Sequence, residues 1–396
     1  MEIAVPVSGS AAALEKRGLL VAYAVFGIFW GSWAAVLPDV RARSDLSDGQ
    51  LGLALAAVAV AAVPVMPLAG RLMDRHGARR LLPNALLAFA AVTALLGFAV
   101  APLALVVALV LLGAVTGVLD VAANAATAAW ERVEGRRLMT AGHGCFSLGV
   151  LAGAALTGVA RDLGAGPAVV LGAGALVVAV AALAQPRYRL VPAGEVADPA
   201  GRWRVAPLLV GLGAVIAGTF LVEDAVGAWS ALHLERTLSA PPWMSGLGPG
   251  LFAGAMAAAR FGAHWFVRPG HDARVVALGA TGLATGMLVL ALAPVPEVAL
   301  GGAVLGGLGI SVLAPTLLSA VGARSAPGRQ GADLALVTTF GYAGFVTGPV
   351  LVGLLSAALS LPTALALLAV LAGVMAAAGP WLLSRPVRRP EASLTR

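Results

Sequence analysis

Long apolar runs separated by short polar loops extend through almost the whole chain. A helix that crosses a membrane needs about 20 mostly apolar residues. Twelve runs are of about that length: 19–37, 51–68, 82–100, 103–128, 140–159, 166–183, 207–232, 244–263, 275–293, 298–321, 334–355 and 361–383. None of them alternates with the period of two that is typical of a barrel strand. Because backbone polar groups inside a bilayer must bond within their own segment, the pattern predicts an all-α membrane protein with twelve transmembrane helices.

The composition agrees with lipid as the solvent for this surface. Hydrophobic residues make up 60% of the 396 positions and charged residues only 11%, whereas a soluble domain carries roughly 25% charged residues. The alternative, several very apolar soluble domains, conflicts with how much apolar surface a chain of this length can bury. The single cysteine, Cys145, excludes an intrachain disulfide and a multi-cysteine metal site.

The basic residues are unevenly distributed between alternate loops. If both termini are placed in the cytoplasm, Arg260 falls inside a helix, four of the 26 Lys and Arg residues fall outside the cell, and 21 fall inside. The outer four are Arg41, Arg43, Arg161 and Arg236. This bias predicts a multi-pass inner-membrane protein with both termini in the cytoplasm. It also accounts for the net charge of +7 without a nucleic-acid partner.

The chain divides into two similar halves. Residues 185–206 are polar and contain three prolines, so they predict a cytoplasmic linker between residues 1–184 and residues 207–396. Glycines recur between the halves at offsets of about 193 residues, and those of the fifth run recur in the eleventh: Gly149, Gly153 and Gly158 as Gly344, Gly348 and Gly353. The repeat predicts two pseudo-symmetric six-helix bundles with a substrate path between them.

The loop after the second run carries the most specific motif, from Gly70 to Arg80. It matches the pattern G-x-L-x-D-R-x-G-x-R at Gly70, Leu72, Asp74, Arg75, Gly77 and Arg79, and so resembles the signature of the major facilitator superfamily. The resemblance implies alternating access between two six-helix bundles. We expect Gly70 to permit close helix packing, Gly77 to adopt a positive φ, and Asp74 to form an ion pair in only one conformation. A basic loop with chance glycines is the alternative.

The fourth run contains an isolated acid. Asp120 and Asn124 are four residues apart and share a helix face, and a carboxylate inside a membrane helix indicates a functional site. The segment resembles the sugar-permease branch typified by fucose–proton symporters, in which the acid is Glu. That resemblance implies that Asp120 carries protons and that Asn124 contacts substrate. The alternatives are a structural Asp–Asn hydrogen bond or pairing with Arg132.

Other candidates lie in the first, fifth, seventh and eighth runs. The adjacent acids Glu223 and Asp224 must face protein or water, so we expect them to contribute to proton coupling. Aromatic faces beside carboxylates suit sugars or cations, although tryptophans are also interfacial anchors. The substrate-binding candidates of these runs are Trp30, Trp33, His143 and Trp229. His143 is equally a helix-end residue bonded to a carbonyl, and Arg260 either balances an intramembrane acid or extends to the surface.

The sequence therefore predicts a secondary active transporter for a small polar, sugar-like solute, with proton symport. The alternatives are a metabolite or drug efflux antiporter and a non-transporting receptor or scaffold with the same fold. Neither a phosphate-binding loop nor a Ser–His–Asp arrangement is recognisable, so we expect no enzymatic activity and no cofactor. The expected partners are the solute, protons and the lipid bilayer, with the chain as a monomer.

Overall fold

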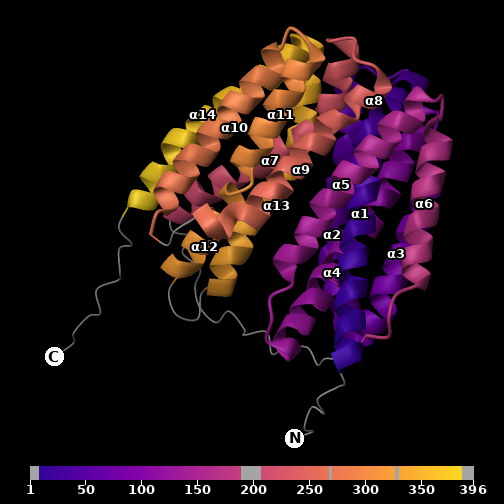
Figure 1. The fold of residues 1–396 in the computed structure, drawn as a ribbon, viewed down its shortest axis with the longest axis vertical. Coiled ribbons are helices and arrows are strands. Elements are labelled where there is room, and N and C mark those ends of the chain that lie inside the picture. The colour runs from indigo at the N-terminus through magenta and orange to yellow at the C-terminus, as the bar shows by residue number, and fades with distance from the viewer. Residues whose placement is uncertain (1–8, 189–206, 267–269, 326–329, 386–396) are drawn as a thin grey trace, which may run out of the picture.

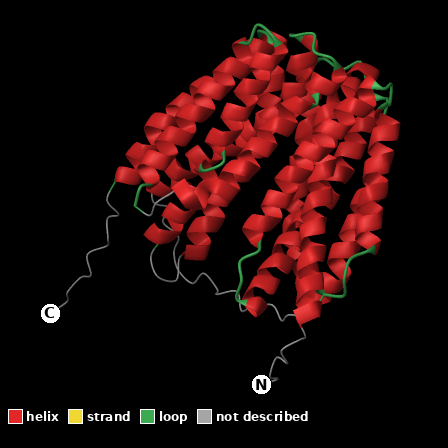
Figure 2. Ribbon diagram, viewed as in Figure 1, coloured by secondary structure: helices red, strands yellow, loops and turns green. Residues whose placement is uncertain are grey.

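The computed structural model describes residues 9–188, 207–266, 270–325 and 330–385. These residues form only helices, connected by short loops (Figure 2). The first half contains α1 (Gly9–Arg43), α2 (Asp48–His76), α3 (Ala78–Leu96), α4 (Pro102–Glu134), α5 (Met139–Asp162) and α6 (Pro167–Leu183). The second half contains α7 (Pro207–Arg236), α8 (Pro242–Ser245), α9 (Leu247–Phe266), α10 (Asp272–Leu292), α11 (Pro296–Ile310), α12 (Leu313–Arg324), α13 (Gln330–Ala358) and α14 (Leu361–Ser384).

These helices make up the twelve predicted spans. Ten helical segments in the described part of the chain are long and apolar enough to cross a membrane, and α11 with α12 count as one of them. The 17-residue α6 and the 20-residue α9 complete the set, while α8 is a single turn that leads into α9. The predicted all-α fold is confirmed. The predicted half boundaries fall where α6 ends and α7 begins, and most of the predicted linker lies outside the described residues.

Two predicted runs differ from the helices that form. The run 298–321 is interrupted between α11 and α12 at Ser311 and Val312, because Pro315 has no N–H to donate to the Ser311 carbonyl. In α1, the apolar run ends before Pro38, but the helix continues to Arg43. This extension places Asp39 and Arg41 at a helix end beyond the apolar segment.

The repeated glycines make equivalent contacts in the two halves. A Cβ added to Gly149 or Gly153 of α5 would lie 2.2 or 2.1 Å from a backbone carbonyl of α1. A Cβ added to Gly344 or Gly348 of α13 would lie 2.1 or 2.5 Å from a carbonyl of α7. The fifth helix of each half therefore packs on the first helix through the same glycines, as the pseudo-symmetry predicts.

The third repeated glycine packs between the halves. Gly158 of α5 lies against the backbone of Trp243 in α8, while Gly353 of α13 lies against Gly52 of α2. The two bundles meet at the end of the molecule where α8 lies, and both described termini lie at the opposite end (Figure 1). We call the first end the far side and the second the terminal side.

In the loop motif between α2 and α3, one glycine has the predicted conformation and the other lacks the predicted packing. Gly77 has φ 68°, and its N–H donates to the Met73 carbonyl at 2.8 Å, which confirms the predicted turn. A Cβ added to Gly70 would have no neighbouring atom within 4 Å. The expectation that Gly70 permits close packing is therefore wrong in this conformation, because no neighbouring helix approaches it.

Candidate functional site

Asp120 lies at the centre of a hydrogen-bonded group inside the helical bundle. Asn124 donates through Nδ2 to Asp120 Oδ1 at 3.0 Å, one turn along α4. Glycines position this helix: a Cβ on Gly113 would lie 2.1 Å from the Val58 carbonyl of α2, and Gly117 is also in close contact with α2. The Asp–Asn bond that the sequence left as an alternative is thus present, whereas Arg132 is exposed three turns away.

The group extends from Asp120 into three further helices. The Tyr342 hydroxyl of α13 donates to Asp120 Oδ2 at 3.3 Å, and the Tyr23 hydroxyl of α1 donates to Asn124 Oδ1 at 2.7 Å. The Tyr23 ring lies on the His143 ring of α5, with centroids 5.3 Å apart. We call these residues, Tyr342, Asp120, Asn124, Tyr23 and His143, the central polar chain. It joins the two halves, because Tyr342 comes from the second.

The α7 acids Glu223 and Asp224 lie beside a cation but have no fixed partner. Arg260 of α9 interacts electrostatically with both Glu223 and His143. No hydrogen bond joins either carboxylate to a described residue. Gly227, one turn further along α7, also faces open space. The two acids are therefore available to a solute or to protons, and their role stays a prediction.

The tryptophans differ in their surroundings. Trp229 is fully buried, and its indole N–H donates to the Pro349 carbonyl of α13 at 3.2 Å. Trp33 is also buried. Trp30 is partly exposed and packs edge-on against Phe29, with ring centroids 5.3 Å apart. Trp30 is the most exposed of the three, and solute contact by Trp30, Trp33 and Trp229 stays a prediction.

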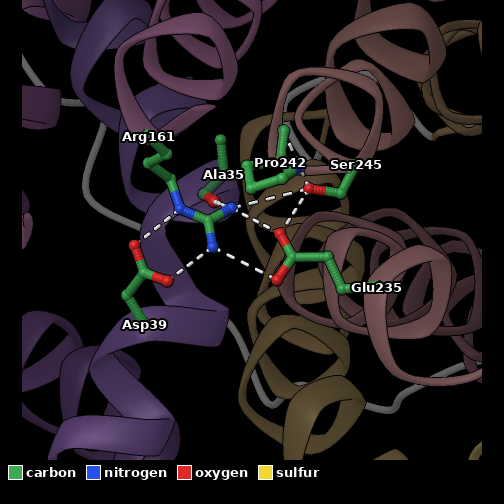
Figure 3. A network of polar contacts seen from close by, with 6 residues as sticks. All are labelled: Ala35, Asp39, Arg161, Glu235, Pro242 and Ser245. Carbon is green, nitrogen blue, oxygen red and sulfur yellow. Dashed lines mark hydrogen bonds and ion pairs between the residues drawn. The ribbon is translucent and has the colours of Figure 1, made fainter. Parts of the chain in front are cut away.

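A second polar group closes the far side around Arg161 of α5. Figure 3 shows its guanidinium between two carboxylates. It donates to both oxygens of Asp39 in α1 at 2.6 and 2.7 Å, and through Nη1 to Glu235 of α7 at 2.5 Å. Nη1 also donates to the Ala35 carbonyl at 2.7 Å, and Ser245 donates to Glu235 at 2.5 Å. Only 2% of the Arg161 side chain is exposed, so it is a buried cation held by one acid from each half.

A neighbouring group has the opposite arrangement of charge. Asp48, at the start of α2, accepts from Arg41 of α1 at 2.8 Å and from Arg236 of α7 at 2.6 Å. Ser356 of α13 donates to its second oxygen at 2.6 Å. We call the two groups together the far-side clamp: Arg161 with Asp39 and Glu235, and Asp48 with Arg41 and Arg236. Two consecutive residues of α7 thus bind side chains of opposite charge in the first half: Glu235 binds Arg161, and Arg236 binds Asp48.

Sequence reasoning missed the clamp as a functional group. Its members are distant in the chain, for example 122 residues between Asp39 and Arg161. A usable signal was present, because three of the four arginines assigned to the outer side belong to the clamp: Arg41, Arg161 and Arg236. A basic residue that departs from the general bias needs a specific partner.

The charged residues of the loop motif at the terminal side are exposed, unlike most of those in the clamp. Asp74, Arg75 and Arg79 are all exposed. Within the described part of the chain, Asp74 has no basic side chain within ion-pair distance. No group of three metal-binding side chains occurs in the described residues. Among the described residues, the molecule is therefore held closed by ion pairs at its far side, and the motif charges at its terminal side are not paired.

The whole chain matches a known family. The model of the Major Facilitator Superfamily matches residues 19–276 and 270–396. The chain belongs to the major facilitator superfamily. An uncharacterized MFS-type transporter of Yersinia pestis is 30% identical over 361 residues, which cover 90% of this chain and 93% of that protein. The membrane protein MosC of Rhizobium meliloti is 28% identical over 92% of this chain and 89% of its own length.

Solved structures show the same fold at lower identity. A bacterial homolog of the human lysosomal transporter Spinster, in an inward-facing and occupied conformation, aligns with a TM-score of 0.74 at 15% identity. The alignment covers 96% of this chain and 98% of that one. The nucleoside transporter NupG aligns with a TM-score of 0.72 at 13% identity, over 94% and 99% of the two chains. The fold and the membership of a membrane transporter family follow from these matches.

Proposed function

We propose that this member of the superfamily moves a small polar solute across the membrane by alternating access, coupled to protons through Asp120. The observation that carries the proposal is the central polar chain, which is hydrogen-bonded from Tyr342 to Tyr23, ends in the ring contact with His143, includes an acid inside apolar helices and joins both halves. An intramembrane carboxylate is costly to keep, so it indicates a role in binding or proton transfer.

The difference between the two ends supports alternating access. The clamp fixes the two halves together at the far side, whereas the charges of the Asp74 motif at the terminal side form no ion pair with the described part of the chain. We assign the terminal side to the cytoplasm, because 21 basic residues fall there and four at the far side. In this assignment the clamp closes the outer entrance.

The groups along the chain favour a solute rich in hydroxyl groups. Tyr23, Asn124 and Tyr342 offer hydroxyl and amide groups, which bind sugar-like ligands by directed hydrogen bonds. Trp30 adds a partly exposed aromatic face on the same helix as Tyr23. The resemblance to sugar permeases at Asp120 and Asn124 points to the same class and to symport.

A second candidate is efflux of a cationic metabolite or drug in exchange for protons. The observation that favours it is the Glu223–Asp224 pair, which no described residue neutralises by a hydrogen bond. Two carboxylates with one nearby guanidinium leave a negative excess that an organic cation would balance.

Reconstituted protein separates these candidates. A thermal-shift screen with monosaccharides, polyols, nucleosides and amines identifies a ligand, whose uptake is then measured in proteoliposomes with and without an imposed pH gradient. Symport predicts accumulation with the proton gradient, and Asp120→Asn should abolish accumulation but keep downhill exchange. Accumulation by well-folded Asp120→Asn contradicts the assignment of Asp120, movement against the proton gradient favours efflux, and no flux of any bound ligand favours a receptor or scaffold.

A further inference from the structure

The Tyr342–Asp120 hydrogen bond joins the halves deep inside the bundle. Asp120 is the nineteenth of 33 residues in α4, and Tyr342 is the thirteenth of 29 residues in α13. Both are therefore close to the middle of their helices, about as far from the clamp as from the terminal side. A change in this bond acts directly on the contact between the halves.

The donors and acceptors around Asp120 are not equally free to change. Asn124 donates its amide N–H to Asp120, and its amide oxygen accepts from Tyr23. Turning the amide over would present an oxygen to Asp120 only if the Tyr23 hydroxyl also reversed, so that it accepted from Asn124 and kept Met139 Sδ, 3.3 Å away, as its acceptor. Tyr342 has a hydroxyl group, which can rotate and either donate or accept. Of the two groups bonded to Asp120, Tyr342 can reverse its role by rotating one hydroxyl, whereas Asn124 can do so only together with Tyr23.

Protonation of Asp120 therefore changes the bond to the other half. An ionised carboxylate accepts from both neighbours, and the bond from Tyr342 is then charge-assisted and about twice as strong as a neutral one. A protonated carboxyl must itself donate. The acceptor within reach is the Tyr342 oxygen, so the proton reverses or breaks the bond from α13. The link between the halves is stronger when Asp120 is charged.

Few other charges face this site. Glu131 of α4 acts electrostatically on Tyr23, and its carboxylate accepts from the Met139 N–H. Tyr23 lies behind Asn124, with His143 of α5 against its ring. The parts of α2 and α3 that lie within the bundle, residues 49–70 and 81–96, contain no titratable side chain. The charge of Arg260 acts on His143 and Glu223.

We propose that Tyr342 is a positioning residue that transmits the protonation state of Asp120 from the first half of the molecule to the second. The inference rests on the proposed role of Asp120 as the proton carrier. Ionised Asp120 links α4 to α13 through this hydrogen bond and favours the observed conformation, in which the far side is closed. Protonation weakens this hold and lets the halves move apart at the far side.

Distances between two spin labels, measured as a function of pH, test this proposal directly. Cys145→Ser removes the single cysteine, and Phe98→Cys with Leu359→Cys adds one spin label to a far-side loop of each half. Both positions are exposed and neither belongs to the clamp. Pulsed electron paramagnetic resonance in lipid nanodiscs then gives the ratio of short to long distances as a function of pH. We expect this ratio to rise about fivefold to tenfold from acidic to alkaline buffer.

The variants separate a transmitting role from a merely structural one. Tyr342→Phe should abolish the pH dependence, as Asp120→Asn should, and the double variant should behave like Asp120→Asn alone. Tyr188→Phe is the matched control, because it removes a hydroxyl that bonds Gln185 near the terminal side, and it should keep the full pH dependence. A structural role for Tyr342 would shift the ratio equally at every pH.

The possible results distinguish the role of Tyr342 from the role of Asp120. If Asp120→Asn abolishes the pH dependence but Tyr342→Phe keeps it, Tyr342 does not transmit the signal, while the proposed proton site stands. If the two single variants have additive effects, they act separately and the inference is overturned. If the wild type and Asp120→Asn respond to pH alike, the proton role of Asp120 fails, and the inference fails with it.

Discussion

The two ends of this molecule carry their charges in opposite ways. At the far side, six charged residues from both halves are paired in the clamp, with Arg161 almost completely buried. At the terminal side, the charges of the loop motif are exposed, and Asp74 has no ion pair with any described residue. The conformation is therefore defined by which set of charges is paired. The most informative variants are those that change one end and leave the other unchanged.

The largest effect is expected for Arg161→Ala. This change leaves Asp39 and Glu235 without the cation that both share, and breaking a buried ion pair costs about 3–5 kcal/mol. We expect a lower free energy of unfolding in detergent and a larger distance between the far-side loops. Arg43→Ala is the control, since Arg43 is an exposed arginine of the same loop region. Equal effects of the two variants would contradict a special role for Arg161.

A smaller effect is expected when the halves are forced apart by one methyl group. A Cβ at Gly158 would lie 2.9 Å from the Pro242 carbonyl across the interface, so Gly158→Ala should cost about 1–3 kcal/mol. Gly70→Ala at the terminal side meets no atom within 4 Å and should be neutral or up to about 1 kcal/mol stabilising. Unfolding of both variants in the same detergent measures the difference. A destabilising Gly70→Ala would show that the terminal side packs more tightly than this conformation indicates.

The outer member of the clamp should contribute less and should respond to salt. Arg236 is 45% exposed, so its pair with Asp48 is screened, and Arg236→Ala should cost no more than about 1 kcal/mol. The difference from wild type should shrink at high ionic strength. The loss in Arg161→Ala should persist there, because the guanidinium is buried. Unfolding titrations at low and high salt test this, and a salt-independent Arg236→Ala would contradict the expected screening.

The smallest equilibrium effect is expected for Asp74→Asn. Asp74 is exposed and forms no ion pair with a described residue in the observed conformation, so the change should alter neither the free energy of unfolding nor ligand affinity. If Asp74 pairs only after the terminal side closes, exchange between conformations should become slower. Single-turnover transport and equilibrium ligand binding, measured on the same preparation, separate the two. Weakened binding with unchanged turnover would remove Asp74 from the conformational mechanism.

Much of the architecture could be predicted from local sequence patterns. Hydrophobic length predicted the twelve spans, and the 195-residue offset of Gly149 and Gly153 predicted contacts that recur at Gly344 and Gly348. The same-face spacing of Asp120 and Asn124 allowed their hydrogen bond, which the sequence left as one alternative. These features depend on one helix or on a repeated pair of helices. Helix geometry and the bilayer determine them without knowledge of distant neighbours.

The partners of the polar side chains required the tertiary structure. The indole N–H of Trp229 donates to the Pro349 carbonyl of α13, 120 residues away, and no pattern in α7 indicates this partner. Tyr342 was not among the candidates, although its hydroxyl bonds to Asp120 across 222 residues. The interruption between α11 and α12 also differs from the continuous span that hydrophobicity predicted.

The sequence by itself determined that this chain spans a membrane with two similar bundles, and which family it resembles. Apolar length, basic-residue bias and glycine spacing act through short-range physics, namely burial in lipid and backbone hydrogen bonding within a helix. Only the tertiary structure decided which end is closed and which acid accepts a hydrogen bond from the other half. Ion pairs such as Arg161–Glu235 and hydrogen bonds such as Tyr342–Asp120 depend on the relative position of whole bundles. A charged residue has the same sequence neighbours in every conformation, but its bonding partners change when the bundles move.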